Sequence, residues 1–462
     1  MTDGAPAAAP PTPRNPALMS ATRAYVRAAI ELLAAGPKPP REASWLDEHW
    51  VRSSVRSWVR EVRPRVTWPD LQTRTEELHA LPAYVTALAA LEADSVIAPQ
   101  LDQIVGSRLT GMSKIDRQSV LDQIAHGTTT ETPFVFDESR FVESYLRSES
   151  SLYATAVEIV VIAPTAGLES APKLRFGEVE LDTFSDEEAQ ALIEAGFLQG
   201  MPMGNVSILA NTDHVLRLRY TAPRVIGAEA LEADQTPRRD VAAEFTEILN
   251  AMRLYKGEPI SLPGIMTFYR MDRGGSARGF GALAPLPPIY QPTYKLDEPE
   301  GAELVALWDQ MRDPAVAKRE FLGTAARRFT YAGERTRIED RFVDLIVAAE
   351  AMFLGEQEES TTEIAFRIST RFAHFFEIPG TTRRERYEHM KLAYGIRSKI
   401  VHGGKRKKLK TPKELEDFTN LTATYLRRCL REMIALAQLW PSRRPLVSWD
   451  DLIVGERAPR AM

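Results

Sequence analysis

Between residues 301 and 439 the apolar residues recur at helical spacing with few interruptions, and this pattern constrains the fold more than any other feature. Such a stripe covers one face of a helix and must be buried against other elements. Further stripes begin at Ile364, Tyr387 and Phe418. Residues 301–440 are therefore expected to form an all-α four-helix bundle with short connections. The cleanest stripe follows the spacing i, i+3, i+4, i+7, i+10, i+11 and consists of Phe342, Leu345, Ile346, Ala349, Met352 and Phe353.

Two helices of this region carry terminal signals. Thr411-Pro-Lys-Glu414 is a capping box with proline at the first helical position, so it predicts the start of the last long helix. Gly403-Gly404 predicts the end of the preceding helix, because glycine accepts the left-handed conformation that commonly closes a helix. This assignment places Arg397 in the last turns of that helix and His402 at its very end.

Residues 150–285 combine strand and helix patterns and are expected to form an α+β middle domain with antiparallel strands. The nearly uncharged segment 153–163 predicts a buried strand, and the alternation in 216–220 predicts a strand with one solvated face. Ser185-Asp-Glu-Glu188 is a capping box ahead of an expected helix over 189–195, and a second helix is expected over 241–255. The chain as a whole is thus predicted to be a multidomain α+β protein.

The glycine-rich segment 273–281 resembles a phosphate-binding loop only superficially. It lacks the Gly-Lys-Ser/Thr ending and the following helical pattern that such a loop requires. A hairpin between a strand at 265–269 and a later strand is the preferred interpretation.

The remaining segments are assigned mainly from composition. Residues 1–16 are Ala/Pro-rich and predicted to be a disordered tail, and 17–148 are predicted to be a helical region. Proline-rich residues 286–300 are expected to form a linker, and 441–462 a C-terminal tail. Four tryptophans in the helical region are expected to pack in a core, with base stacking as the alternative; they are Trp45, Trp50, Trp58 and Trp68.

The bulk composition points to a cytoplasmic protein without cofactors. The chain has 462 residues, a single cysteine and no apolar run near the ~20 residues that a membrane span requires. One cysteine excludes an internal disulfide framework. The seven histidines form no Cys/His cluster or His-x-x-x-His pair, so no metal site is predicted.

Arg397 and His402 are the residue types that metal-independent cleavage of a phosphodiester requires. A guanidinium stays cationic and its forked donors match a phosphate, whereas an imidazole can give or take a proton near neutral pH. The alternative interpretation is structural, because both residue types also favour the negative end of a helix dipole. On an ideal helix, positions i and i+5 lie about 140° apart, so the two side chains do not share a face.

Residues 300–440 resemble the HEPN superfamily, in particular its ApeA-like branch. The resemblance is carried by 344–354, 363–371 and the run Tyr394-Gly-Ile-Arg-Ser-Lys-Ile-Val-His-Gly403, which is similar to the family signature of Arg, four to six residues, then His. It covers about a third of the chain. Residues 249–255 also resemble the region that precedes this domain in such proteins.

The resemblance implies a helical bundle that dimerises and acts as a metal-independent endoribonuclease in toxin, antiphage or RNA-processing systems. It assigns Arg397 and His402 as the catalytic pair, brought together with a second pair in the composite cleft of a homodimer. Ser398 and Glu350 are expected to support them. The family often has Asn, Asp or His where this chain has Ser398, so the match is weaker there.

Local charge favours RNA as the partner. Residues 381–410 contain eleven basic and two acidic residues, although the whole chain has a net charge of −5. Lys399 is one of the expected phosphate-binding residues, and a basic run follows His402 directly. The alternative is that this run is only a solvated surface. The run consists of Lys405, Arg406, Lys407 and Lys408.

Two other functions stay open at this level. The bundle could be a catalytically inactive HEPN module that binds RNA or protein and mediates dimerisation. Alternatively, the functional site lies in the middle domain and the bundle only dimerises the chain. In either case the segments before residue 300 are candidates for contact with an unknown regulator.

Overall fold

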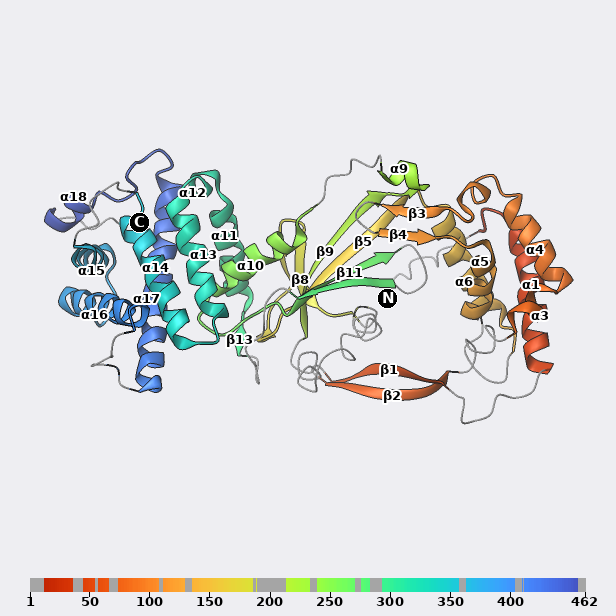
Figure 1. Cartoon of the computed structure of the whole chain (residues 1–462), viewed down its shortest axis with the longest axis horizontal. Helices are drawn as coiled ribbons and strands as arrows, with labels where there is room; N and C mark the ends of the chain where they lie inside the picture. The colour runs from red at the N-terminus through yellow and green to blue at the C-terminus, as the bar shows by residue number, and fades with distance from the viewer. Residues whose placement is uncertain are drawn as a thin grey trace, which may run out of the picture.

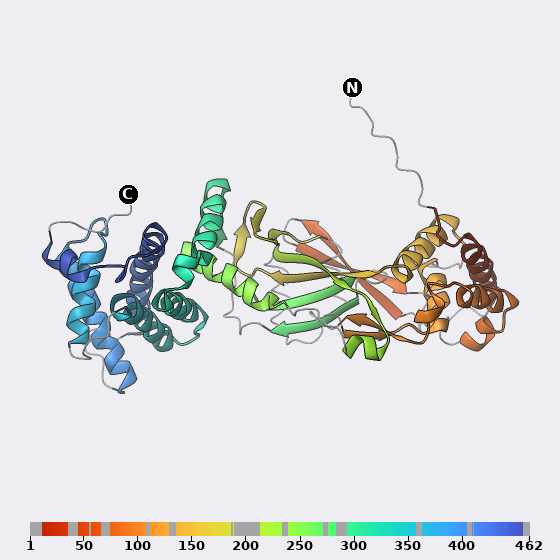
Figure 2. The same ribbon diagram turned by 90° about the horizontal axis from the view of Figure 1, so that it is seen from above.

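The computed structural model describes residues 12–35, 45–54, 57–65, 74–107, 111–128, 135–185, 188, 213–232, 239–270, 276–282, 293–356, 363–403, 409 and 411–455. Three parts follow one another along the long axis of the molecule (Figures 1 and 2). A helical bundle lies at one end, an antiparallel sheet in the middle and the N-terminal helices at the other end. The predicted mixture of helices and antiparallel strands is therefore confirmed.

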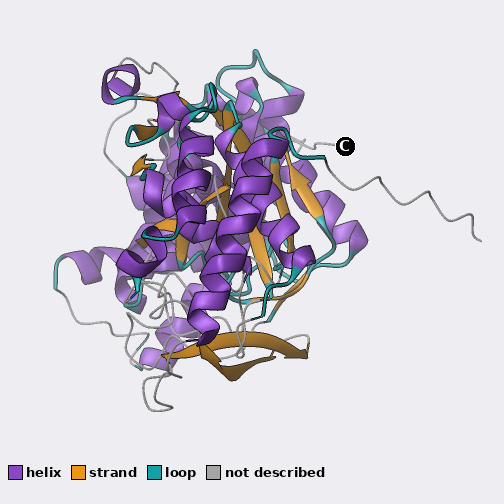
Figure 3. Cartoon of the chain, turned by 90° about the vertical axis from the view of Figure 1, so that its right-hand side faces the viewer, coloured by secondary structure: helices purple, strands orange, loops and turns teal. Residues whose placement is uncertain are grey.

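The N-terminal part contains strands that the sequence interpretation missed. Two pairs of strands interrupt the predicted helical region 17–148, namely the hairpin β1–β2 and the pair β3–β4, with β10 completing a small sheet around β3. Residues 45–65 are rich in Trp and Val, which favour a pleated surface over a helix. In Figure 3 the hairpin lies apart from the main sheet. The strands are β1 (Trp45–Ser54), β2 (Ser57–Arg65), β3 (Ile104–Ser107), β4 (Gly111–Lys114) and β10 (Val225–Ile226).

The helices of this part form their own apolar core, which includes the fully buried Tyr25, Phe141 and Tyr145. Trp68 lies outside the described residues, and the packing of the other three tryptophans stays a prediction. The helices are α1 (Pro16–Ala35), α3 (Thr75–His79), α4 (Pro82–Glu92), the 3-10 turn η2 (Ala98–Gln100), α5 (Arg117–Thr128) and α6 (Glu138–Leu152).

The predicted disordered tail 1–16 is too long at its C-terminal end. The backbone N–H groups of Arg14 and Asn15 each donate to the Glu149 carboxylate at 2.9 Å, and the Asn15 side chain accepts from Leu18 N at 2.9 Å. Composition alone missed this, because the partner carboxylate is more than a hundred residues away in the sequence.

The middle part is a six-stranded sheet in the order β12-β11-β5-β9-β8-β7, and every neighbouring pair is antiparallel. The predicted strands at 153–163 and 216–220 are its two central strands. The predicted hairpin around 273–281 is confirmed by the pairing of β11 with β12. The strands are β5 (Ala156–Pro164), β7 (Leu174–Phe176), β8 (Val179–Thr183), β9 (His214–Pro223), β11 (Gly264–Arg270) and β12 (Ser276–Ala282).

The expected solvated face of β9 is only partly solvated. Arg219 is exposed, but Arg217 is buried and its Nη2 donates to the Glu188 carboxylate at 2.6 Å. The predicted capping box is present, because Glu188 N donates to Ser185 Oγ at 3.1 Å and Ser185 N donates to Glu188 at 2.9 Å. The helix expected over 189–195 lies outside the described residues.

Helix α10 (Val241–Tyr255) connects the sheet to the bundle. It packs against α11 (Glu298–Arg312), α13 (Glu320–Glu334) and α17 (Pro412–Leu439). One continuous apolar core extends from the strands through α10 into the bundle helices. The small helix α9 (Ala228–Glu232) lies before α10.

The predicted linker 286–300 is wrong over its second half. The parallel pair of β6 (Leu168–Ser170) and β13 (Tyr294–Lys295) anchors it to the middle part. Tyr294 is fully buried, and its hydroxyl donates to Met252 O at 2.9 Å. Asp297 then caps α11 through a capping box with Glu300. Proline content predicted a spacer, but a buried aromatic residue fixes the segment.

Among the described residues of the C-terminal part, the regular elements are all helices, as predicted. Besides the helices α13 to α17, this part contains α11, α12 and α18, so it has more helices than the predicted four-helix bundle. A bundle of the HEPN kind therefore stays a prediction. The predicted C-terminal tail 441–462 is wrong up to residue 455, because Trp449 of α18 packs 5.8 Å from Phe353 and 5.9 Å from Phe375 between ring centroids. The other helices are α12 (Pro314–Ala317), α14 (Ile338–Leu354), α15 (Ile364–Phe375), α16 (Arg383–Val401) and α18 (Trp449–Val454).

Candidate functional site

Helix α16 ends at the predicted glycines, and its start carries a capping box that the sequence interpretation missed. Thr382 N donates to the Glu385 carboxylate at 2.7 Å, and Glu385 N donates to Thr382 Oγ1 at 3.2 Å, so a capping box fixes the start. At the other end, His402 is the C-cap and its N–H donates to Ser398 O at 3.0 Å. Gly403 follows with φ +69°, a conformation that favours glycine. The helix therefore stops at a defined point and leaves His402 on its rim.

Arg397 points from α16 toward α14 rather than into solvent. Its guanidinium Nη2 lies 3.6 Å from Glu350 Oε1, and the two side chains are 25% and 24% exposed. The guanidinium carbon also lies 5.9 Å from the centroid of the Tyr394 ring. Tyr394 precedes Arg397 by three residues, which places both on one face of the helix. The Tyr394 hydroxyl hydrogen-bonds to Glu350, so the three side chains form a closed cluster.

The cluster leaves one donor unused. Arg397 Nε is buried and has no hydrogen-bond partner among the described residues. An unsatisfied buried donor is costly, so such a group in a native protein calls for an explanation. Arg397 is thus held in place at one end of its guanidinium and incompletely paired at the other.

Burial and charge shift the proton equilibria of the cluster. Burial raises the pKa of Glu350, while Arg397 and the Tyr394 hydroxyl act in the opposite direction and do not fully cancel it. Burial and the neighbouring Glu350 carboxylate raise the pKa of Tyr394. Glu350 and Tyr394 therefore hold their protons more tightly than the same groups do in water.

The Glu350 shift predicts a pH-dependent effect on stability. A folded pKa above the ordinary value of 4.5 means that ionisation of Glu350 opposes folding as pH rises through that range. Glu350→Gln cannot ionise, so it is expected to be more stable than the unmodified protein near neutral pH and about equally stable below 4.5. Urea denaturation at both pH values measures the difference.

Glu385→Gln on α16 provides a control for which the expected effect has the opposite sign. Hydrogen bonds to Thr382 lower the pKa of Glu385, so its contribution to stability is present above 4.5 and is lost as pH falls. This variant is expected to be the less stable one near neutral pH. A Glu350→Gln variant that loses stability at neutral pH would contradict the assignment, and would mean that the ion pair with Arg397 outweighs burial.

The other predicted site residues lie at the exposed end of α16. His402 and Lys399 are exposed and Ser398 is half-buried. Within the described segments none of the three side chains makes a hydrogen bond or an ion pair. The predicted phosphate-binding residues Lys405, Arg406, Lys407 and Lys408 lie outside the described residues.

The structure brings Glu350 to Arg397. Ideal helical geometry places Arg397 and His402 on different faces of α16. Five residues of an ideal helix separate them by about 7.5 Å along the axis and about 140° around it. Tyr394 is the site residue that sequence reasoning missed. Its spacing of three residues from Arg397 was a usable signal, since both positions face the same neighbouring helix.

His389, the other histidine of α16, is structural. Its ring stacks on Phe418 with centroids 4.5 Å apart, and Nε2 lies 3.0 Å from Thr422 Oγ1. Burial lowers the pKa of His389 to about 4, so the ring is neutral near pH 7. Among the described residues no group of three or more His, Cys, Asp or Glu side chains is placed to hold a metal ion.

The middle part offers a competing surface in an open depression of about 540 Å³ on the sheet. Its charges pair with one another: Lys173 lies 3.1 Å from Asp182, and the buried Arg217 is held by Glu188. These internal pairs engage part of the charge in the lining, and the exposed Arg219 also borders the depression.

Comparisons with known proteins do not add to this site. No family model, no curated protein and no solved structure matches the chain. In the described part of the chain, none of the helices combines the length and the apolar composition needed to cross a membrane.

Proposed function

We propose that the protein is a metal-independent endoribonuclease of the HEPN type, with Arg397 and His402 as its catalytic residues. The observation that carries the proposal is the fixed position of the Arg397 guanidinium, 3.6 Å from Glu350, on a helix that ends at the exposed His402. A guanidinium held by a second helix is pre-organised for a phosphate, and an exposed imidazole is available for proton transfer.

In the proposed reaction the 2′-hydroxyl of RNA attacks the adjacent phosphorus. A new P–O2′ bond forms, the P–O5′ bond breaks, and the products are a 2′,3′-cyclic phosphate and a 5′-hydroxyl. In a homodimer, one His402 takes the proton from the 2′-hydroxyl, and the His402 of the second copy gives a proton to the leaving 5′-oxygen. Arg397 neutralises the charge that develops on the phosphoryl oxygens.

A second copy of the chain resolves the divergence of the two side chains. Two residues about 140° apart on one helix do not reach one phosphate unaided. In a homodimer the Arg397 of one copy and the His402 of the other would meet across the two-fold axis. Ser398, next to Arg397 and half-buried, is proposed to hydrogen-bond the phosphate or orient His402. Lys399 and the basic run Lys405–Lys408 would hold the RNA backbone.

A substrate with a single 2′-deoxynucleotide tests this chemistry. The purified full-length chain is expected to cleave an end-labelled RNA and leave a 2′,3′-cyclic phosphate. One 2′-deoxy substitution at the scissile position should abolish cleavage there, because the attacking oxygen is absent, and excess EDTA should not slow cleavage elsewhere. Cleavage at the deoxy position, or complete loss of activity in EDTA, would contradict the proposal.

A catalytically inactive HEPN module is the second candidate. It is favoured by Ser398, which departs from the family's usual Asn, Asp or His, and by the pairing of Arg397 with Glu350, which engages the guanidinium internally. RNA retardation in a gel with no cleavage of any RNA tested between mildly acidic and mildly alkaline pH would establish it.

Under either proposal the chain acts in the cytoplasm, with antiphage defence or stress response as the setting. The segments before residue 300 are the proposed place for a regulator to bind.

A further inference from the structure

The exposed face of α16 carries a stripe of residues that ends at His402. Arg384 and Lys391 precede His402 by 18 and 11 residues, and both offsets return to within about 20° of its direction on an ideal helix. Gly395, seven residues before His402, falls on the same stripe. All four residues are exposed. At about 1.5 Å per residue the stripe is about 27 Å long. Figure 1 shows α15 and α16 side by side at the end of the molecule away from the sheet.

The exposed side of α16 has a surplus of positive charge. Within the described residues, the cations of the stripe form no ion pair with a carboxylate. Of the acidic residues on this helix, Glu385 is engaged by the capping box with Thr382. The exposed charged residues of α16 are the four cations Arg383, Arg384, Lys391 and Lys399 and the two carboxylates Glu385 and Glu388.

An aromatic pair borders the stripe at Lys391. Phe366 of α15 is 55% exposed, and its ring meets Tyr387 edge-to-face with the centroids 6.3 Å apart. Lys391 Nζ lies 5.5 Å from the centroid of the Tyr387 ring, which joins the pair to the stripe. An exposed ring beside a row of cations is the combination that binds single-stranded nucleic acid, because bases stack on the ring while phosphates meet the cations.

Gly395 leaves room for a strand along the stripe. It lies in the interior of a helix, where glycine is less favourable than alanine. A Cβ added there would meet nothing within 4 Å, so packing inside the described chain does not require glycine. A bare backbone also lets a ligand approach closely. Gly323 of α13 is equally exposed and open, so it is the position of Gly395 between Lys391 and His402 that matters.

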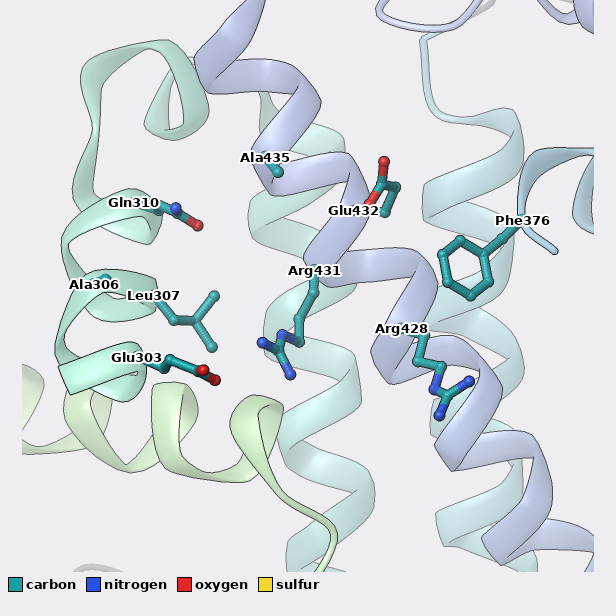
Figure 4. A pocket seen from close by; sticks show the side chains of 9 residues that line it. All are labelled: Glu303, Ala306, Leu307, Gln310, Phe376, Arg428, Arg431, Glu432 and Ala435. Atoms are coloured by element: carbon teal, nitrogen blue, oxygen red, sulfur yellow. The ribbon is translucent and has the colours of Figure 1, made fainter. Parts of the chain in front are cut away.

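The pocket of about 430 Å³ between α11 and α17 lacks such an arrangement (Figure 4). In Figure 4 the Glu303 carboxylate lies beside the Arg431 guanidinium, and the guanidiniums of Arg428 and Arg431 point apart. These two arginines therefore do not form a joint anion site. The cations of α16 differ because they follow one direction along the helix.

We propose that the stripe is a docking track for single-stranded RNA, on which a strand runs from the Phe366–Tyr387 pair to His402. The choice of RNA rests on the proposed function. Phosphates of the strand contact Arg384 and Lys391, and an unpaired base stacks on Phe366. A second copy of the chain is the alternative occupant of an exposed aromatic face. It fits less well, because a two-fold contact would bring the like charges of the stripe together.

Fluorescence anisotropy with labelled oligo(U) and oligo(dT) tests the track, using full-length chains that carry His402→Ala so that the RNA stays intact. Both strands are expected to bind, since stacking and phosphate contacts do not need the 2′-hydroxyl. Phe366→Ala should weaken binding by about fivefold or more, the loss of one stacked base, and leave the salt dependence unchanged. Lys391→Gln should instead reduce the slope of log affinity against log salt by about 0.7.

Gly395→Gln keeps the test independent of misfolding. Glutamine is the better helix former, so the variant should have a higher urea midpoint and yet bind RNA more weakly, because its side chain occupies the track. The matched controls change the same residue types at exposed positions of α12 and α13, and they should bind like the parent chain. They are Gly323→Gln, Tyr331→Ala and Lys318→Gln.

The track is overturned if neither oligonucleotide binds, or if the α15 and α16 variants bind as tightly as their controls. It is also overturned if Phe366→Ala abolishes self-association in sedimentation and keeps full RNA affinity, since the face then belongs to a second copy. Binding that depends on Phe366 and Lys391, in a chain that cleaves no RNA, would support the track and remove the nuclease. Cleavage by the unmodified chain with unaffected variants would do the reverse.

Discussion

His402→Ala is expected to lower the rate of RNA cleavage by about 10²–10⁴-fold, the contribution that a positioned general acid or base typically makes. The side chain is exposed and its backbone N–H, not its ring, forms the helix-ending hydrogen bond to Ser398 O. Alanine therefore removes the proton-transfer group without disturbing the fold. Single-turnover cleavage of a labelled RNA measures the effect.

Arg397→Ala is expected to have an effect of similar size by a different route, because it removes the cation that would stabilise the developing charge. Arg397→Lys keeps the charge but loses the fork, so it should retain part of the activity. His374→Ala on α15 and Arg327→Ala on α13 are the matched controls and should cleave normally, since both lie outside the basic segment 381–410. Undiminished cleavage by both His402→Ala and Arg397→Ala would rule out this pair as the catalytic residues.

Arg253→Ala is expected to destabilise the protein by about 3 kcal/mol, near the lower end of the range for breaking a buried ion pair. Arg253 of α10 is 8% exposed; its Nη1 donates to Glu334 of α13 at 2.8 Å and its Nε to Ile260 O at 3.2 Å. Alanine leaves both acceptors without this donor. Glu334 is 29% exposed and gains some hydration in return, which limits the loss.

Arg312→Ala separates this effect from the loss of any arginine. Arg312 is 51% exposed and lies 3.6 Å from Glu247, so its removal should cost about 1 kcal/mol or less. Chemical denaturation of the two variants in parallel gives the comparison. Equal destabilisation by both would mean that the buried position of Arg253 confers no special stability.

The elements that sequence predicted well are those fixed by neighbouring residues. The helix 241–255, the C-terminal end of α16 and the start of α17 follow from apolar spacing, Gly403 and the Thr411 capping box, all of which act within a few residues. The position of His402 on the rim of its helix follows from the same local rules. No distant contact is needed to predict any of them.

The features that sequence missed depend on contacts between distant segments. Tyr294 lies in a proline-rich segment, yet its side chain is buried and its hydroxyl donates to Met252 O of α10. Likewise, Glu350 reaches Arg397 only because α14 packs against α16. Such contacts are set by tertiary packing, which overrides local preference.

The continuous core that runs from the strands through α10 into the bundle has a practical consequence for dissecting the protein. A fragment that begins at residue 301 would lack α10, and the faces of α13 and α17 that α10 covers would meet water. Such newly exposed apolar area favours self-association over autonomous folding. Truncation, the usual way to isolate one domain, therefore suits this chain poorly unless the excised piece retains the sheet as well.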